Sequence, residues 1–207
     1  MFGNMHYGET APLRSFRFHF LISILVLSLH APRGYAQTAQ DTSTTKTQPA
    51  ATERDGRHDF DQLLGKWKYH LKRRMNPLTG SNTWVEFDGT GACYKVWDGS
   101  QLDTIEVDGP TGHISGLTLR VYNPQSHQWR LYWANKTIGV LDPPQVGEFK
   151  NGRGEFFAQD TINGKTILIR FEWTNLTTTP HFEQSFSDDG GKTWEVNWIT
   201  DQTRVQD

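Results

Sequence analysis

Hydrophobic and polar residues alternate in short runs from residue 65 to the end of the chain. A period of two is typical of β-strands that bury one face, and no stretch in this region keeps the 3.6-residue period of a long helix. In one run Ile167, Ile169 and Trp173 share a side, whereas Arg170 and Glu172 share the other. Such runs occupy residues 66–73, 83–87, 92–97, 102–107, 114–122, 128–134, 145–149, 155–160, 166–173, 181–187 and 195–200.

Tight turns separate these runs. Asp-Gly and Asn-Gly pairs, which readily adopt the positive φ angles of short hairpins, stand at 88–89, 98–99, 108–109, 151–152 and 163–164. Strands joined in sequence by such turns predict an antiparallel meander, and closing a meander into a barrel removes its exposed edges. We therefore predict an all-β domain over residues 58–207, a single up-and-down antiparallel β-barrel of about ten strands. A two-sheet sandwich is the alternative.

Two further patterns refine this prediction. Apolar residues at 60, 63 and 64 have helical spacing, which predicts a short helical turn before the first strand. Alternation places Trp129 and Trp133 on one face of their strand, and it places Trp194, Val196 and Trp198 on one face of the last strand. We expect both faces to line the barrel interior.

The N-terminal residues 1–36 have the pattern of a signal peptide. Two arginines precede an apolar run of about ten residues, and a small-x-small cleavage motif ends at Ala36. The run is shorter than the roughly 20 residues that a membrane-spanning helix needs. We expect export to the periplasm or beyond, with cleavage near Ala36 and no integral membrane segment afterwards; an uncleaved anchor is the alternative.

Residues 37–57 are rich in Thr, Gln, Ser and Ala and contain no large apolar side chain. Such a segment cannot offset its ordering entropy by burial, so we expect a disordered linker.

Composition narrows the range of partners. The chain has 21 Lys and Arg against 23 Asp and Glu, a balance that indicates no nucleic-acid partner. Its single cysteine, Cys93, excludes an intramolecular disulfide, and its place in a predicted strand indicates a buried, inert thiol. The pattern does not indicate an oligomeric state.

Gly65-Lys66-Trp67 opens the first predicted strand, and Arg204 follows the last one. Together with residues 60–64 and 187–194, these positions resemble a lipocalin-like (calycin) family of exported bacterial domains of unknown function. The resemblance covers about residues 60–204. It implies a barrel with a cavity, closed structurally by Gly65, Trp67 and Arg204, and a guanidinium over an indole contributes about 0.5–2 kcal/mol. It implies no reaction.

A second motif lies near the C-terminus. Ser187, Asp189, Gly191 and Trp194 match the Asp-box hairpin, Ser-x-Asp-x-Gly-x-Thr-Trp, of sialidase-like β-propellers. A propeller needs one such box in each of several blades, and this domain has one box. We therefore interpret the motif as a structural hairpin whose side chains bond the turn backbone.

An aromatic surplus carries the functional prediction. Ligand pockets are mostly apolar with a few placed polar groups, so the aromatic residues predict a barrel that binds a small hydrophobic or amphipathic ligand. Core filling is the alternative for the tryptophans, and solvent-facing charge pairs are the alternative for the polar residues. The cavity candidates are Trp84, Trp97, Trp129, Trp133, Trp173, Trp198, Arg170 and Glu183.

Motifs for catalysis are missing from the sequence. There is no Gly-x-Ser-x-Gly, Walker or dinucleotide-binding glycine pattern, so we predict no catalytic residue and no cofactor. The histidines have no metal-ligand spacing, so we predict no metal site. A barrel enzyme, hydrolase or isomerase, with polar residues in its cavity remains an alternative, as does a structural or interaction module with a filled core. The histidines considered are His58, His70, His113, His127 and His181.

Overall fold

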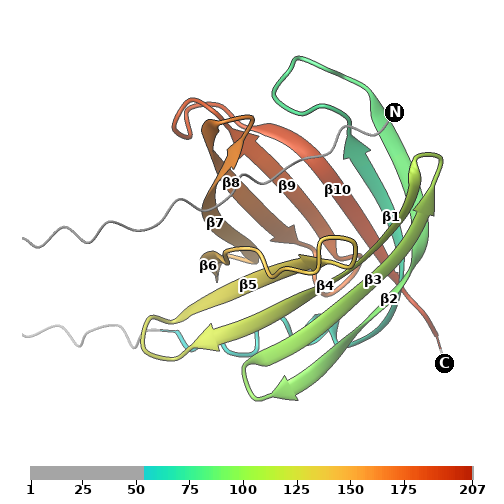
Figure 1. The fold of residues 1–207 in the computed structure, drawn as a ribbon. Helices are drawn as coiled ribbons and strands as arrows, with labels where there is room; N and C mark the ends of the chain where they lie inside the picture. Colours follow the sequence, from blue (N-terminus) through green and yellow to red (C-terminus); the bar gives the residue numbers. More distant parts are fainter. Residues whose placement is uncertain (1–53, 207) are drawn as a thin grey trace, which may run out of the picture. The chain divides into compact units, whose positions relative to one another are not determined.

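The structure, a computed structural model, describes residues 54–206, and their ten strands form a closed antiparallel barrel (Figure 1). Each strand pairs with its neighbours in sequence, and β1 pairs with β10 to close the ring. This up-and-down order confirms the predicted fold and rules out the sandwich. The strands are β1 (Gly65–Arg74), β2 (Trp84–Trp97), β3 (Ser100–Gly109), β4 (Gly112–Asn123), β5 (Gln128–Asn135), β6 (Gln145–Lys150), β7 (Arg153–Ile162), β8 (Lys165–Thr174), β9 (His181–Ser187) and β10 (Glu195–Arg204).

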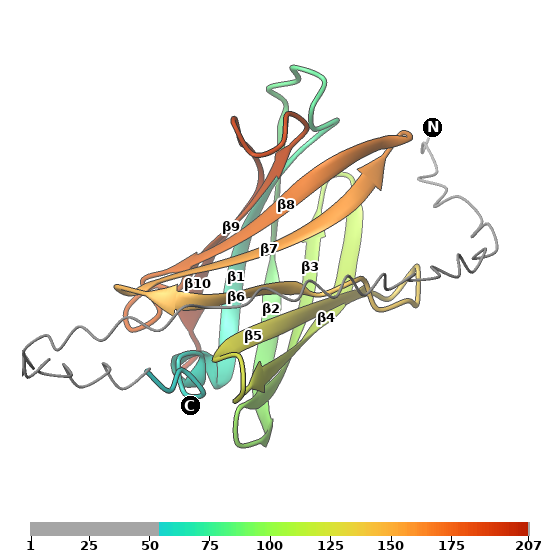
Figure 2. The ribbon, with the colours of Figure 1, turned by 90° about the vertical axis from the view of Figure 1, so that its left-hand side faces the viewer.

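A short 3-10 helix, η1 (Asp61–Leu63), precedes β1 at one end of the barrel, as predicted (Figure 2). The segment just before it also contacts the barrel: the Trp129 indole N–H donates to the carbonyl of Gly56 at 2.9 Å, and the Gly56 N–H donates to the Tyr122 hydroxyl at 3.0 Å. The folded part therefore begins before residue 57, where the expected linker ends. The predicted signal peptide and most of the linker lie outside the described residues. Among the described residues, no helix has the length and hydropathy needed to cross a bilayer.

Cross-strand partners share a face, so the strand register shows which side chains point inward. Trp129 is opposite Gly147 and Tyr122, and its side chain is buried. The inward faces of β5 and β8 agree with the alternation in the sequence. The last strand does not, because the register shifts by one residue between Val196 and Trp198. This β-bulge leaves Trp198 inside but turns Trp194 and Val196 outward, which corrects the expected single face.

One predicted turn is also wrong. Asp88-Gly89 lies in the middle of β2, which runs unbroken through two of the predicted strands. A Cβ on Gly89 would lie 2.0 Å from the carbonyl oxygen of Glu106 in β3. Glycine is present here because two strands approach closely, not because the chain turns. The hairpin at Asn151-Gly152 does adopt the expected positive φ angles, 53° and 79°.

Two aromatic clusters fill much of the interior. One lies at the closed end and surrounds Phe60, and the other lies against β1–β4 and surrounds Trp67 and Phe87. Trp133 and Trp198 come from strands on opposite sides of the ring, yet their ring centroids are 6.4 Å apart. This pair therefore meets across the barrel interior.

The closed end is held by Arg204. Its guanidinium carbon lies 4.2 Å from the ring centroid of Trp67, and its two terminal nitrogens donate to the carbonyls of Leu64 at 2.8 Å and Gln62 at 2.7 Å. The Trp67 indole N–H donates to the carbonyl of Leu63 at 2.6 Å. The contact expected from the Gly-x-Trp resemblance is present, and it also ties η1 to the last strand.

Replacing Arg204 by alanine is expected to lower the free energy of unfolding by about 1–2 kcal/mol, because it removes the contact with the Trp67 indole and leaves two carbonyls without their donor. Thermal unfolding monitored by circular dichroism measures this. Thr203→Ala, an exposed neighbour on the outer face, is the matched control. An unchanged melting temperature in Arg204→Ala would contradict the closing role.

Candidate functional site in the barrel interior

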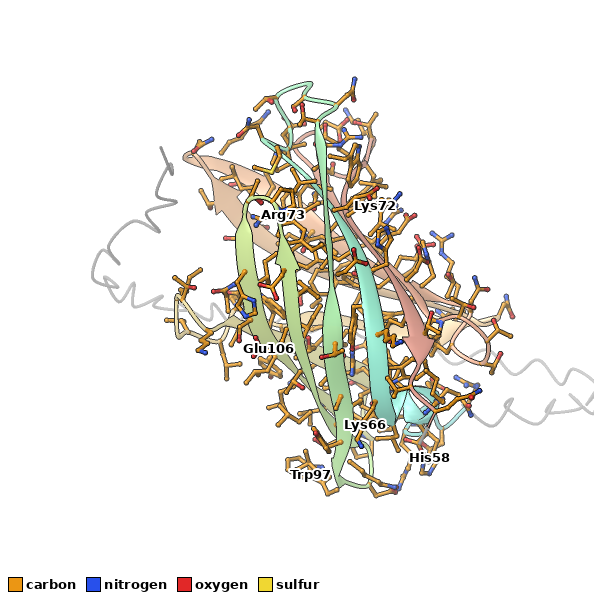
Figure 3. The ribbon with its side chains drawn as sticks, turned by 90° about the vertical axis from the view of Figure 1, so that its right-hand side faces the viewer. His58, Lys66, Lys72, Arg73, Trp97 and Glu106 are labelled. Atoms are coloured by element: carbon orange, nitrogen blue, oxygen red, sulfur yellow. The ribbon has the colours of Figure 1, made fainter. Side chains whose placement is uncertain are left out.

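The six tryptophans predicted to line a cavity separate into two groups. Trp129, Trp133, Trp173 and Trp198 face the interior, according to the strand register and their core contacts. The other two do not. Trp84 lies on the outer face at the rim, with the Arg74 guanidinium 5.0 Å from its ring centroid. Trp97 is 55% exposed at the tip of the β2–β3 hairpin (Figure 3).

The two polar cavity candidates also point outward. Arg170 lies over the Trp194 ring at 4.8 Å on the outside of the barrel. Glu183 is opposite Glu172 and Ile199, and its carboxylate lies 3.2 Å from Nε2 of His181. Both residues alternate with inward-facing aromatic side chains, so they cannot belong to an interior site.

The interior does hold a charged group that the sequence analysis did not select, Arg120 on β4. It is 1% exposed, and its Nη2 donates to the Asp103 carboxylate at 2.6 Å. The Tyr69 hydroxyl donates to the other oxygen of Asp103 at 3.0 Å. Burial alone would lower the pKa of Arg120, but Asp103 outweighs it and raises the pKa, so the guanidinium remains charged. In the sequence, Arg120 is an even number of residues from Ile114 and Tyr122. Alternation along the strand therefore placed Arg120 on the same face as these two apolar residues.

The guanidinium of Arg120 is also enclosed by aromatic rings. Its central carbon lies 4.9 Å from the ring centroid of Phe60 and 5.2 Å from that of Trp173. Cys93 lies beside it, with Sγ 3.7 Å from Nη1 of Arg120 and donating to Gln101 at 3.4 Å. Burial raises the pKa of the Cys93 thiol to about 11, so the thiol is protonated at neutral pH.

Several inward-facing side chains keep contact with solvent. Phe171, Gln184 and Trp198 are cross-strand neighbours on β8, β9 and β10, and each is half-buried. Trp133 and Ala158, which also face inward, are half-buried too. A closed barrel with a fully packed core would bury these positions. These inward-facing positions are therefore not fully enclosed by neighbouring side chains.

Among the ten strands, β6 has the shortest pairing with its neighbours. β6 pairs with β5 at three positions only, and it pairs with β7 only as far as Phe157. The end of β7 from Ala158 to Ile162 consequently extends past β6 and pairs on one side, with β8 (Figure 2). On the other side of β6, the β5–β6 loop stays near β5 through a bridge between Ala134 and Leu141.

The Asp-box residues build the hairpin between β9 and β10. Asp189 accepts hydrogen bonds from the backbone N–H and the hydroxyl of Thr193, and also from the Ser187 hydroxyl. These bonds, the Thr193 N–H first, hold the pKa of Asp189 well below its usual range. A pocket of about 260 Å³ lies between this hairpin and the β1–β2 loop, with Leu78 and Trp194 in its lining. Its polar lining includes side chains of the turn and Glu195 of β10, whose carboxylate accepts from the Leu78 N–H and pairs with Arg74.

Three of the histidines belong to one row on the outer face. Nδ1 of His181 lies 2.7 Å from Asp201, and partial burial opposes its protonation, but the hydrogen bonds to Asp201 and Glu183 prevail and raise its pKa. Within residues 54–206 no three His, Cys, Asp or Glu side chains are grouped so that they could hold a metal ion. Cross-strand register places the row as His113, Asp108, Asp88, His70, Asp201 and His181.

Comparison with known proteins adds no function. No protein-family profile matches the chain, and no curated protein sequence matches it. Among solved structures, the crystal structure of Rv2717c from M. tuberculosis matches with a TM-score of 0.49 and 12% sequence identity, over 74% of this chain and 99% of that chain.

Proposed function

We propose that this protein binds a small hydrophobic or amphipathic molecule in a chamber inside its barrel, bordered by inward-facing side chains that are not fully buried. The observation that carries the proposal is the set of inward-facing aromatic side chains, Phe171, Trp133 and Trp198, that are only partly buried inside a closed barrel. Binding sites for small molecules are concave and mostly apolar, with a few polar groups that orient the ligand. The proposal includes export of the protein and kinship with the lipocalin-like barrels.

The interior chemistry favours binding over catalysis. General acid–base catalysis works best with a group whose pKa lies near the working pH. Burial moves the pKa of Tyr69 well above its usual value, and burial likewise raises that of Cys93. Asp103 is committed to Arg120 and to the Tyr69 hydroxyl. These groups are suited to positioning a ligand.

Filling the chamber tests the proposal. Titration with N-phenyl-1-naphthylamine, a neutral aromatic probe that fluoresces in apolar surroundings, is expected to show saturable binding to the native protein. Ala158→Trp places an indole in the chamber and is expected to weaken binding about tenfold or more, equivalent to at least about 1.4 kcal/mol. The matched control is Gln159→Trp, because Gln159 is the exposed, outward-facing neighbour.

Either of two outcomes would overturn the proposal. The first is a titration of the native protein without saturable fluorescence, which would mean that no chamber accepts the probe. Alternatively, equal loss of affinity in Ala158→Trp and Gln159→Trp, or none in either, would place the probe elsewhere. Far-UV circular dichroism of both variants shows that the barrel itself is intact.

A further inference from the structure

We infer that the chamber takes a flat, neutral molecule that carries an amide edge, a C=O beside an N–H as in a lactam, and that Arg120, Trp173 and Gln145 bind that edge. The inference rests on the proposed binding function and names the chemical class of its ligand. It comes from three buried polar atoms that have no partner in the protein.

These atoms belong to three side chains that are each at least nine-tenths buried. Nε of Arg120, Nε1 of Trp173 and Oε1 of Gln145 make no hydrogen bond, although their residues are 1%, 5% and 4% exposed. Buried polar atoms are normally paired, because leaving one without a partner carries its full desolvation cost. By contrast, the buried indole of Trp129 does donate to the carbonyl of Gly56.

The three side chains converge on one region of the interior. Arg120, Leu131 and Gln145 are direct cross-strand neighbours on β4, β5 and β6, so they point inward at one level of the barrel. Neighbouring side chains in such a row lie about 5 Å apart at Cβ. Trp173 comes from the far wall, and its ring centroid lies 5.2 Å from the guanidinium carbon of Arg120. The row ends at β6, the strand with the shortest pairing.

Donor and acceptor types select the ligand's polar group. Arg120 and Trp173 offer N–H donors, whereas Gln145 offers a carbonyl acceptor. The complement is a group that accepts hydrogen bonds at a carbonyl and donates one from an adjacent N–H. A ring amide does both within one plane, and a planar ring can stack among the aromatic side chains that border the chamber.

Charge selects a neutral group over an anion. The positive charge of Arg120 is balanced by the buried carboxylate of Asp103, at 2.6 Å. An anionic group at Nε of Arg120 would add a second buried negative charge beside that carboxylate, whereas Arg73, another inward-facing arginine, is exposed and lies 5.8 Å from the Trp198 ring. Of the three guanidinium nitrogens, Nε is the one without a partner, which suits one neutral carbonyl oxygen.

Three probes of similar size separate these alternatives in calorimetric titration of the native protein. They are 2-quinolinone, a planar lactam; naphthalene, the fused-ring hydrocarbon; and 2-naphthoate, an anion. We expect 2-quinolinone to bind at least about tenfold more tightly than either of the others, because only it pairs all three atoms. This comparison uses the native chain, so it does not depend on the folding of any variant.

Two variants assign the preference to named atoms. Trp173→Phe keeps an aromatic ring but removes the indole N–H, and Gln145→Met keeps the length but removes the acceptor. Each is expected to weaken 2-quinolinone about tenfold while leaving naphthalene unchanged. Gln184→Met is the matched control, since Gln184 also faces the chamber but its amide already donates to Asn197 at 2.6 Å.

The remaining outcomes overturn the inference. Equal affinity for 2-quinolinone and naphthalene, or no binding of either, would mean that the three atoms do not bind an amide edge and that water satisfies them. Tightest binding of 2-naphthoate would make the site an anion site. In each of these cases saturable binding of N-phenyl-1-naphthylamine keeps the proposed function, whereas its absence removes both.

Discussion

Replacing Arg120 by methionine is expected to lower the free energy of unfolding by about 3–5 kcal/mol. The substitution leaves the carboxylate of Asp103 buried without its cation, and the Tyr69 hydroxyl alone cannot compensate for the lost charge. Denaturant unfolding followed by tryptophan fluorescence measures the change. Arg130→Met, on the neighbouring strand but exposed and outward-facing, is the matched control and is expected to change stability little.

A second substitution separates the lost ion pair from lost packing. Arg120→Met combined with Asp103→Leu removes both charges, and it is expected to recover most of the lost stability, because well-packed apolar residues often replace a buried ion pair without cost. If the single variant lost less than about 1 kcal/mol, Asp103 would have to reach solvent or take up a proton, and the pairing with Arg120 would not be a main support of the interior.

Truncating Phe60 to alanine is the other large effect, about 3–5 kcal/mol of unfolding free energy. Phe60 is fully buried at the closed end, and its ring contacts four aromatic residues at centroid distances of 4.9 to 5.9 Å. Its removal leaves a cavity that rigid strands on all sides cannot fill by collapsing. Urea unfolding measures the loss, and near-UV circular dichroism is expected to report a changed environment for Trp129 and Trp173.

The matched control for this prediction is Phe157→Ala. Phe157 lies on the outer face of β7 and is 47% exposed, so its truncation creates no cavity and is expected to cost much less than Phe60→Ala. Similar losses in the two variants would contradict the role of Phe60 as the centre of the closed-end cluster. Phe60 precedes η1, so the comparison also tests whether this short segment is part of the barrel's core.

Local pattern was sufficient wherever a strand follows a strict alternation. In β5, Trp129 and Trp133 face inward as the period of two requires, because each residue of a strand turns the next side chain to the opposite face. The same logic failed in β10, where one extra residue at Asn197 reverses the face of everything before it. A bulge of this kind has no signature in the spacing of Trp194 and Trp198.

The interpretation of one glycine and one charged residue from local sequence was wrong for a related reason. Asp88-Gly89 has the composition of a tight turn, yet the close approach of Glu106 from β3 uses the glycine inside a long strand. Arginine is a residue type usually found on the surface, yet the charge of Arg120 is balanced in the interior by Asp103 on the neighbouring strand. In both cases the deciding partner lies 17 residues away in sequence.

The sequence alone was sufficient to predict the class of fold, the approximate number of strands and the short helical turn, because alternation and turn residues act locally and chain order sets the strand pairing. The contact between Trp67 and Arg204 was expected from the resemblance to lipocalin-like barrels. Which aromatic residues meet inside the barrel, and where buried polar atoms remain without partners, could be seen only in the tertiary structure. Those properties depend on the register between strands and on which rings meet across the interior, as Trp133 and Trp198 do. No single strand contains that information, because the two rings come together only when the barrel closes.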